Sequence, residues 1–194
     1  MRPLAVALTG GIAAGKSEAL RAFARHGAVV ASSDEVVHCL YREDGSLQAA
    51  LRERWGDRVF ADGEVDRPEV GRIVFADRGE LEWLERELHP RVRAAIEAWL
   101  GELRRRPDPP AVAVVEIPLL YETGGESRFD RVVVVTAPAA VRRGRRGGFA
   151  ERESRLVPDD EKLRRADFVY VNDGSLEQLD AFAASVVEAL TSST

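Results

Sequence analysis

Residues 4–20 read LAVALTGGIAAGKSEAL, and this stretch decides the fold of the chain. The apolar run from Leu4 to Leu8 predicts a strand that is buried on both faces, as parallel strands are. The residues from Gly15 to His26 predict a helix that ends at Gly27, because their apolar side chains recur at helical spacing. The turn between them carries one of only two lysines among the 28 basic residues of the chain.

That turn matches the pattern G-x-x-x-x-G-K-[ST], from Gly10 to Ser17. In this pattern the backbone N–H groups of the loop surround the phosphates of a nucleotide, and the helix that follows directs its positive end at the same anion. Lys16 would reach the β- and γ-phosphates and the Ser17 hydroxyl would bind Mg²⁺. The slim ammonium of lysine fits this loop, whereas a planar guanidinium does not. The predicted nucleotide-binding residues are Gly11, Ile12, Ala13, Ala14, Gly15, Lys16, Ser17 and Glu18.

Composition excludes several classes of protein. The 194 residues are enough for one substantial core, and a formal charge of −5 argues against a general nucleic-acid-binding protein. No window approaches about 20 uninterrupted apolar residues, so we expect no membrane-spanning helix. The first apolar run continues into a glycine turn and does not resemble a signal peptide, so we expect a cytoplasmic protein. The single cysteine, Cys39, excludes an internal disulfide, and we expect it to be a buried thiol.

The rest of the chain alternates between strand-like and helical segments. Four further strands are predicted at 28–32, 111–117, 131–137 and 168–172, and a closing helix at about 175–190. Residues 33–106 are almost entirely helical in pattern, and we expect Pro90 to break or kink the last helix. The prediction is an α/β fold of the P-loop NTPase type: a doubly wound, five-stranded parallel sheet with a helical insertion and a short lid. Its core would comprise residues 1–32 and 111–194, the lid about 138–165, and the insertion 33–110.

A phosphate-binding loop is compatible with a kinase for small molecules and with a nucleotide-driven switch. The guanine-reading N-K-x-D motif and the D-x-x-G motif of switch GTPases are both absent from the sequence, which favours the kinase. Asp34 follows the second predicted strand, where a carboxylate could orient an alcohol and accept its proton. It could also simply cap the next helix. Glu116 ends another strand and is either a second Mg²⁺ contact or an ordinary strand-end carboxylate.

The segment VRRGRRGGFAERESR, residues 141–155, contains six arginines. Such a run is usually a solvated face, but beside a phosphate site its guanidinium groups could bind the anion in a bidentate manner. Its place after a predicted strand favours the second interpretation. By position, Arg143 and Arg146 are the catalytic candidates and Arg152 is a candidate for nucleotide binding.

Five segments together resemble the dephospho-CoA kinase family: ALTGGIAAGKS, VVASSDEVVHCL, LHPRVR, EIPLLYETG and DDEKLRRADFVYVNDGSLEQL. They occur in the order of the family and span about residues 4–190. The resemblance implies a kinase that transfers the γ-phosphoryl group of ATP, with Mg²⁺, to the ribose 3′-hydroxyl of dephospho-CoA. This is the last step of coenzyme A synthesis. It also implies a P-loop core, a helical insertion that binds the acceptor, and a small lid.

The same resemblance assigns roles to residues of this chain. Asp34 matches the general base, and Asn172 matches an asparagine near the adenine. The acceptor side would be formed by Asp34, His38, His89, Arg93, Leu119, Leu120 and Glu122. Simpler roles are open for some of these: His89 could bend a helix beside Pro90, the leucines could be core, and Asn172 could form a turn.

The sequence departs from the family pattern at several positions. An aspartate of the family is Ser32 here, an arginine is His38, a threonine is Glu18 and a glutamine is Leu156, and the lid is about six residues shorter.

The expected partners are two small molecules, ATP and dephospho-CoA, with no nucleic acid and no membrane, in a monomer or weak homo-oligomer. The alternatives are another small-metabolite kinase of the nucleoside-monophosphate-kinase type, or a weakened relative that binds CoA or nucleotide without catalysis.

Overall fold

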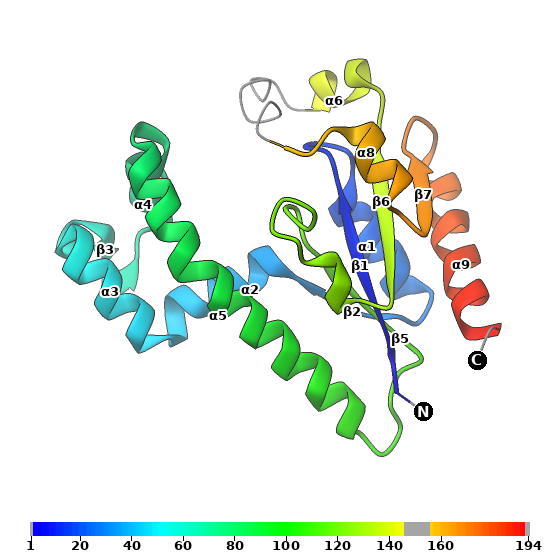
Figure 1. Cartoon of the computed structure of the whole chain (residues 1–194), viewed down its shortest axis with the longest axis horizontal. Helices are drawn as coiled ribbons and strands as arrows, with labels where there is room; N and C mark the ends of the chain where they lie inside the picture. Colours follow the sequence, from blue (N-terminus) through cyan, green and yellow to red (C-terminus); the bar gives the residue numbers. More distant parts are fainter. Residues whose placement is uncertain (1, 146–155, 193–194) are drawn as a thin grey trace. The chain divides into compact units, whose positions relative to one another are not determined.

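The structure is a computed structural model, and it describes residues 2–145 and 156–192 (Figure 1). The chain forms two compact units, which are described separately below. The first comprises residues 1–32 and 100–194, and the second comprises residues 33–99.

The first unit is built on a five-stranded parallel sheet with the strand order β2-β5-β1-β6-β7. The strands are β1 (Leu4–Gly10), β2 (Val29–Ser32), β5 (Val112–Glu116), β6 (Arg131–Thr136) and β7 (Phe168–Val171). The predicted α/β fold with a five-stranded parallel sheet is confirmed. The strand formed by the opening sequence lies at the centre of the sheet, so the turn that follows it emerges in the middle of the carboxyl edge. In open α/β sheets this edge is where ligands bind.

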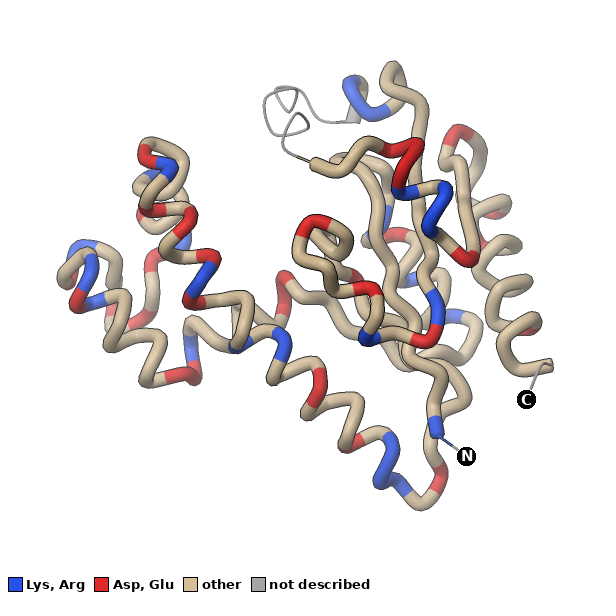
Figure 2. The backbone as a smooth tube through the Cα atoms, in the orientation of Figure 1, with Lys and Arg blue, Asp and Glu red and all other residues tan. Residues whose placement is uncertain are grey.

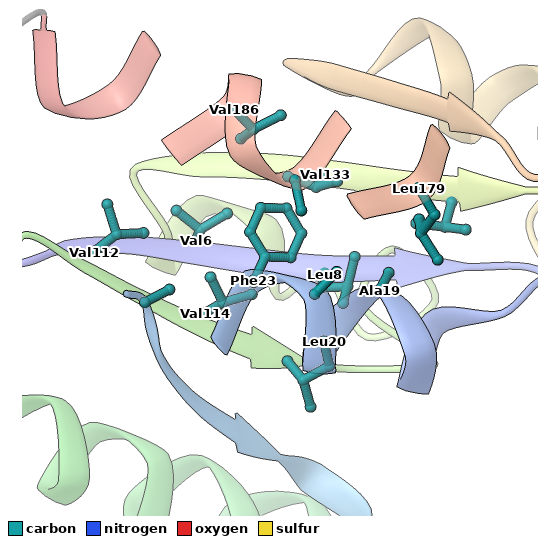
Figure 3. Close-up of a cluster of buried hydrophobic side chains, with 14 of the residues drawn as sticks. Val6, Leu8, Ala19, Leu20, Phe23, Val112, Val114, Val133, Leu179 and Val186 are labelled. Atoms are coloured by element: carbon teal, nitrogen blue, oxygen red, sulfur yellow. The ribbon is translucent and has the colours of Figure 1, made fainter. Parts of the chain in front are cut away.

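One face of the sheet is covered by two helices, α1 (Lys16–Arg25) and α9 (Leu176–Ser192). Phe23 of α1 is completely buried between them and the sheet (Figure 3). Because side chains alternate along a strand, Val6 and Leu8 of β1 point to this face. The same alternation places Phe168 and Tyr170 of β7 here.

On the opposite face, a loop and a short helix pack against part of the sheet. Ala7, Val132 and Val134 of the sheet pack there against Leu120 and Tyr121 of the loop that follows β5. The helix is α8 (Asp159–Arg164). The first unit also contains a 3₁₀ turn, η2 (Glu126–Arg128), and α6 (Ala139–Arg145). The β7 side chains Val169 and Val171 are exposed at the edge of the sheet.

The second unit is mainly helical. Its core includes Tyr41, Leu47, Leu51, Trp55 and Val70. Aspartates cap two of its helices: the Asp44 carboxylate accepts from the N–H groups of Ser46 and Leu47, and Asp66 accepts from Glu69. The helices are α2 (Ser33–Glu43), α3 (Gly45–Trp55), α4 (Arg67–Ala76) and α5 (Arg78–Arg105), the last of which extends into the first unit.

A small antiparallel hairpin interrupts the helices and was not predicted. It follows the 3₁₀ turn η1 (Asp57–Val59) and consists of β3 (Phe60–Ala61) and β4 (Glu64–Val65). Asp62 and Gly63 form its turn, with φ angles of +52° and +84°. An Asp-Gly pair between apolar residues is the strongest short-range hairpin signal, so this element was detectable in the sequence.

The structure corrects two expectations about single residues. Helix α5 is continuous over 28 residues, so Pro90 does not break it, and a kink there stays a prediction. Next to the proline, the Arg91 guanidinium donates to the backbone oxygen of Glu87 at 2.7 Å and to its carboxylate. Cys39 is exposed on α2 rather than buried. Within the described ranges, no helix is both long enough and apolar enough to span a membrane.

The core of the first unit gives a testable prediction. Phe23→Ala removes a fully buried ring and should destabilise the fold by about 3–5 kcal/mol, lowering the melting temperature by roughly 10 °C. Phe75→Ala is the matched control, because that ring is 68% exposed, and it should change the melting temperature by only a degree or two. Thermal unfolding followed by circular dichroism measures both. Equal effects would contradict the assigned core.

Candidate active site

The loop between β1 and α1 is the centre of the candidate site. Gly10, Ala13 and Gly15 have φ angles of +147°, +57° and +101°, so the chain reverses its direction within six residues. A side chain at Gly10 is impossible without rearrangement, because a Cβ there would lie 1.8 Å from the backbone oxygen of Val135 on β6. The left-handed conformation of Ala13 costs an L-residue about 1 kcal/mol, which the rest of the loop must offset.

Lys16 closes this loop. Its Nζ donates to the backbone oxygens of Gly10 at 3.2 Å and Gly11 at 2.9 Å. Lys16 is also the first residue of α1, and Gly15 before it has no side chain that could cap the helix. An ammonium group and the positive end of a helix therefore occur at the same turn, as binding of a polyphosphate requires.

Asn172, which follows β7, holds the loop from the other side. Its amide Nδ2 is buried and donates to the backbone oxygen of Ala14 at 2.8 Å. Its backbone N–H donates to Thr136 at the end of β6. The side chain thus does more than form a turn, because it connects the last strand of the sheet to the phosphate-binding loop.

Ser17 and Glu18 follow Lys16 in the first turn of α1. Ser17 is exposed. The Glu18 carboxylate accepts from Arg21 at 2.9 Å and from Arg25 at 3.4 Å. The hydrogen bond from Arg21 is the main reason that the pKa of the Glu18 carboxyl lies below its usual value. Two arginines therefore balance the negative charge that this chain carries next to the loop.

The arginines after β6 differ sharply in position. Arg143 is exposed on α6, and Arg146 and Arg152 lie outside the described residues. Arg142, which is not among the predicted site residues, is buried, and its Nη1 lies 2.9 Å from the position that a Cβ on Gly11 would occupy. Neighbouring residues on a helix point about 100° apart, so only the packing of α6 decides which arginine faces the loop.

The loop after β5 contains three predicted acceptor-side residues. Leu120 is fully buried in the core and Leu119 is half-buried. The Glu122 carboxylate accepts from the backbone N–H of Val157 at 3.0 Å and lies 2.8 Å from Nζ of Lys162, which is completely buried. These contacts explain Glu122 as a residue that fixes the start of α8 to this loop.

The second unit carries the remaining predicted residues. Asp34 is the second residue of α2 and is exposed, so it lies within the helix and is not the cap residue that precedes it. Its helix starts directly after Ser32, which pairs with Glu116 in the sheet. His38 is exposed, with Nδ1 3.4 Å from Nη1 of Arg67.

His89 and Arg93 both belong to α5, where His89 is half-buried and Arg93 is exposed. Among the residues that the structure describes, no three His, Cys, Asp or Glu side chains cluster as a metal site.

Comparison with known proteins agrees with this geometry. The family model described as dephospho-CoA kinase matches residues 4–178. A dephospho-CoA kinase from Mesorhizobium japonicum is 41% identical over 195 residues, covering 96% of each chain. One from Moorella thermoacetica is 39% identical, covering 89% of this chain and 85% of the relative.

Solved structures agree as well. The dephospho-CoA kinase from Campylobacter jejuni aligns with 97% of this chain and 98% of its own, at a TM-score of 0.73 and 25% identity. The matches extend through both units and include the loop that Lys16 closes. The chain belongs to the dephospho-CoA kinase family.

Proposed function

We propose that this chain transfers the γ-phosphoryl group of ATP to the ribose 3′-hydroxyl of dephospho-CoA, the final step of coenzyme A biosynthesis. The observation that carries the proposal is the loop at 10–15, closed by Lys16, in a chain that matches this family over residues 4–178. Phosphoryl transfer needs little covalent chemistry from the protein, because positioning and charge stabilisation supply most of the catalysis. A rigid loop with an ammonium group at its centre meets that need.

Lys16 and the loop backbone are assigned to the phosphates of ATP. Negative charge spreads over the oxygens of the transferring group, and fixed N–H dipoles and an ammonium stabilise it without having to reorient. The Asn172 amide preorganises the loop through the Ala14 carbonyl. Arg142 is the described arginine that lies against Gly11, and we assign it to the same anion. Arg143, Arg146 and Arg152 remain predictions.

Mg²⁺ is expected to accompany ATP. Ser17 and Glu116 would hold it, since a hydroxyl at the start of α1 and a buried carboxylate at the end of β5 are the oxygen ligands that this ion prefers. When bound, the ion would neutralise charge that builds up on the phosphate oxygens.

Asp34 is proposed as the general base. Its carboxylate is exposed in the first turn of α2, immediately beyond the carboxyl end of β2. There it would orient the ribose 3′-hydroxyl and accept its proton late in the transfer. We assign acceptor binding to the insertion, residues 33–110, through His38, His89 and Arg93. The ion pair with Lys162 favours a structural role for Glu122 over acceptor contact.

The activity can be tested directly. With Mg²⁺ and ATP, the purified protein should form ADP when dephospho-CoA is present and should show no comparable turnover with nucleosides or shikimate. Coupled ADP detection and chromatography of the CoA product measure this. Binding of ATP without turnover on dephospho-CoA would refute the proposed reaction and favour a non-catalytic relative.

Replacing Lys16 tests the loop. Lys16→Ala should lower kcat/KM by roughly 10²–10³, because an ammonium that stabilises transition-state charge is lost. Lys16→Arg keeps the charge, but its wider head should not fit between the Gly10 and Gly11 carbonyls, so a loss of similar size is expected. Near-normal activity of Lys16→Arg would show that charge alone is sufficient.

Replacing Asp34 tests the base. Asp34→Asn should leave ATP affinity intact and lower kcat by roughly 10²–10⁴. Glu35→Gln is the matched control, because Glu35 is the next residue of the same helical turn and is also exposed, and it should leave kcat within about twofold. Turnover of Asp34→Asn at the wild-type rate would remove Asp34 from the mechanism.

A further inference from the structure

A carboxylate to which the sequence motifs assigned no role lies beside the phosphate-binding loop. Helix α8 starts with Asp159, Asp160 and Glu161, followed by basic residues, and Figure 2 shows this red-to-blue order. The two carboxylate oxygens of Asp159 lie 3.4 and 3.5 Å from the position that a Cβ on Gly11 would occupy. Asp159 therefore lies beside the same residue of the loop as Arg142.

Asp159 links three elements of the first unit at this point. Its Oδ2 accepts a hydrogen bond from the Thr136 hydroxyl at the end of β6 at 3.1 Å. The same oxygen lies 3.5 Å from Nη2 of Arg142 on α6. The Arg142 side chain is only 11% exposed and that of Asp159 is 34% exposed. The glycine at position 11 makes room for this pair, because any larger residue would meet the guanidinium at 2.9 Å.

The electrostatics of this arrangement have two opposite consequences for a bound polyphosphate. A carboxylate next to the loop repels phosphate oxygens and by itself would weaken their binding. The same carboxylate holds a guanidinium that attracts them, and a long arginine side chain loses much rotamer freedom when it is fixed. An arginine that is already held in place binds an anion at a lower entropic cost. The change in ATP affinity when the carboxylate is removed therefore distinguishes the two. Weaker binding means that Asp159 acts by holding the arginine, and tighter binding means that it acts by repulsion.

We propose that Asp159 is a positioning residue for nucleotide binding: anchored by Thr136, it holds the Arg142 guanidinium against Gly11, where the phosphates of ATP bind. The proposal rests on the proposed function, since it takes the loop at 10–15 as the ATP site. It assigns no contact between Asp159 and the nucleotide, and its effect passes entirely through Arg142.

The experiment measures equilibrium ATP binding without acceptor, together with KM for both substrates and kcat, on the full chain. Asp159→Asn should weaken ATP binding and raise the KM for ATP about tenfold, while KM for dephospho-CoA and kcat at saturating ATP change little. Asp160→Asn is the matched control. Its carboxylate occupies the same turn but pairs with the exposed Arg164 at 3.3 Å, so ATP binding should stay within about twofold.

A double-mutant cycle separates positioning from general damage. In an Arg142→Met background, Asp159→Asn should cause no further loss of ATP affinity, because the group that it positions is gone. Should Asp159→Asn fail to fold, Thr136→Val decides instead. It keeps the shape of the buried side chain but removes the anchoring hydroxyl, and roughly a threefold loss of ATP affinity is expected.

The outcomes distinguish this inference from the proposed function. Unchanged or tighter ATP binding in Asp159→Asn would overturn the positioning role of Asp159. The same holds if Asp159→Asn lowers ATP affinity as much in the Arg142→Met background as it does in the wild-type protein. A wild-type protein that binds ATP but does not phosphorylate dephospho-CoA would overturn the proposed reaction while the binding cycle still tests Asp159. If the wild-type enzyme has the expected activity and Asp159→Asn binds ATP as tightly as the wild type, only the inference about Asp159 is refuted.

Discussion

The contact between the first strand and its neighbour at Gly10 constrains the rest of the candidate site. The Val135 oxygen of β6 occupies the space where a side chain would begin, so the chain can leave β1 only through a glycine with a positive φ angle. The turn that follows is held by hydrogen bonds from Lys16 and from Asn172. Because β1 is the central strand, these contacts connect the loop to β6 and to the segment after β7. The contacts that join the loop to the strands of the sheet therefore also preorganise the loop.

Both lysines of this arginine-rich chain occupy confined places within the first unit. Lys16 lies between the carbonyls of Gly10 and Gly11, and Lys162 is completely buried beside Glu122. Both places admit a compact ammonium on a flexible stem, whereas a guanidinium needs a wider, planar space and more acceptors. By contrast, Arg21, Arg25 and Arg164 form ion pairs on the surface, where the broad head group is solvated. Such exposed pairs contribute little to stability.

Charge next to the loop is balanced pair by pair. Glu18 is matched by Arg21 and Arg25, and Asp159 is matched by Arg142. Two acidic side chains close to the expected position of the phosphates, Glu18 and Asp159, therefore have basic partners within the first unit. This arrangement shows how the chain accommodates Glu18, which is at one of the positions where the sequence departs from the family pattern. Its negative charge is held by neighbours on its own helix.

The sequence alone determined the alternation of strands and helices, the central loop and the family, because these depend on local residue types and on short, fixed spacings. It also contains the signal for the hairpin, the Asp62-Gly63 pair at its turn. Only the tertiary structure decided which arginine faces the loop, that Asp159 joins it, and that Glu122 pairs with Lys162. The physical reason is that these contacts join segments far apart in the chain. The rotation of a short helix against the sheet sets the direction of each side chain, and no local pattern records that rotation.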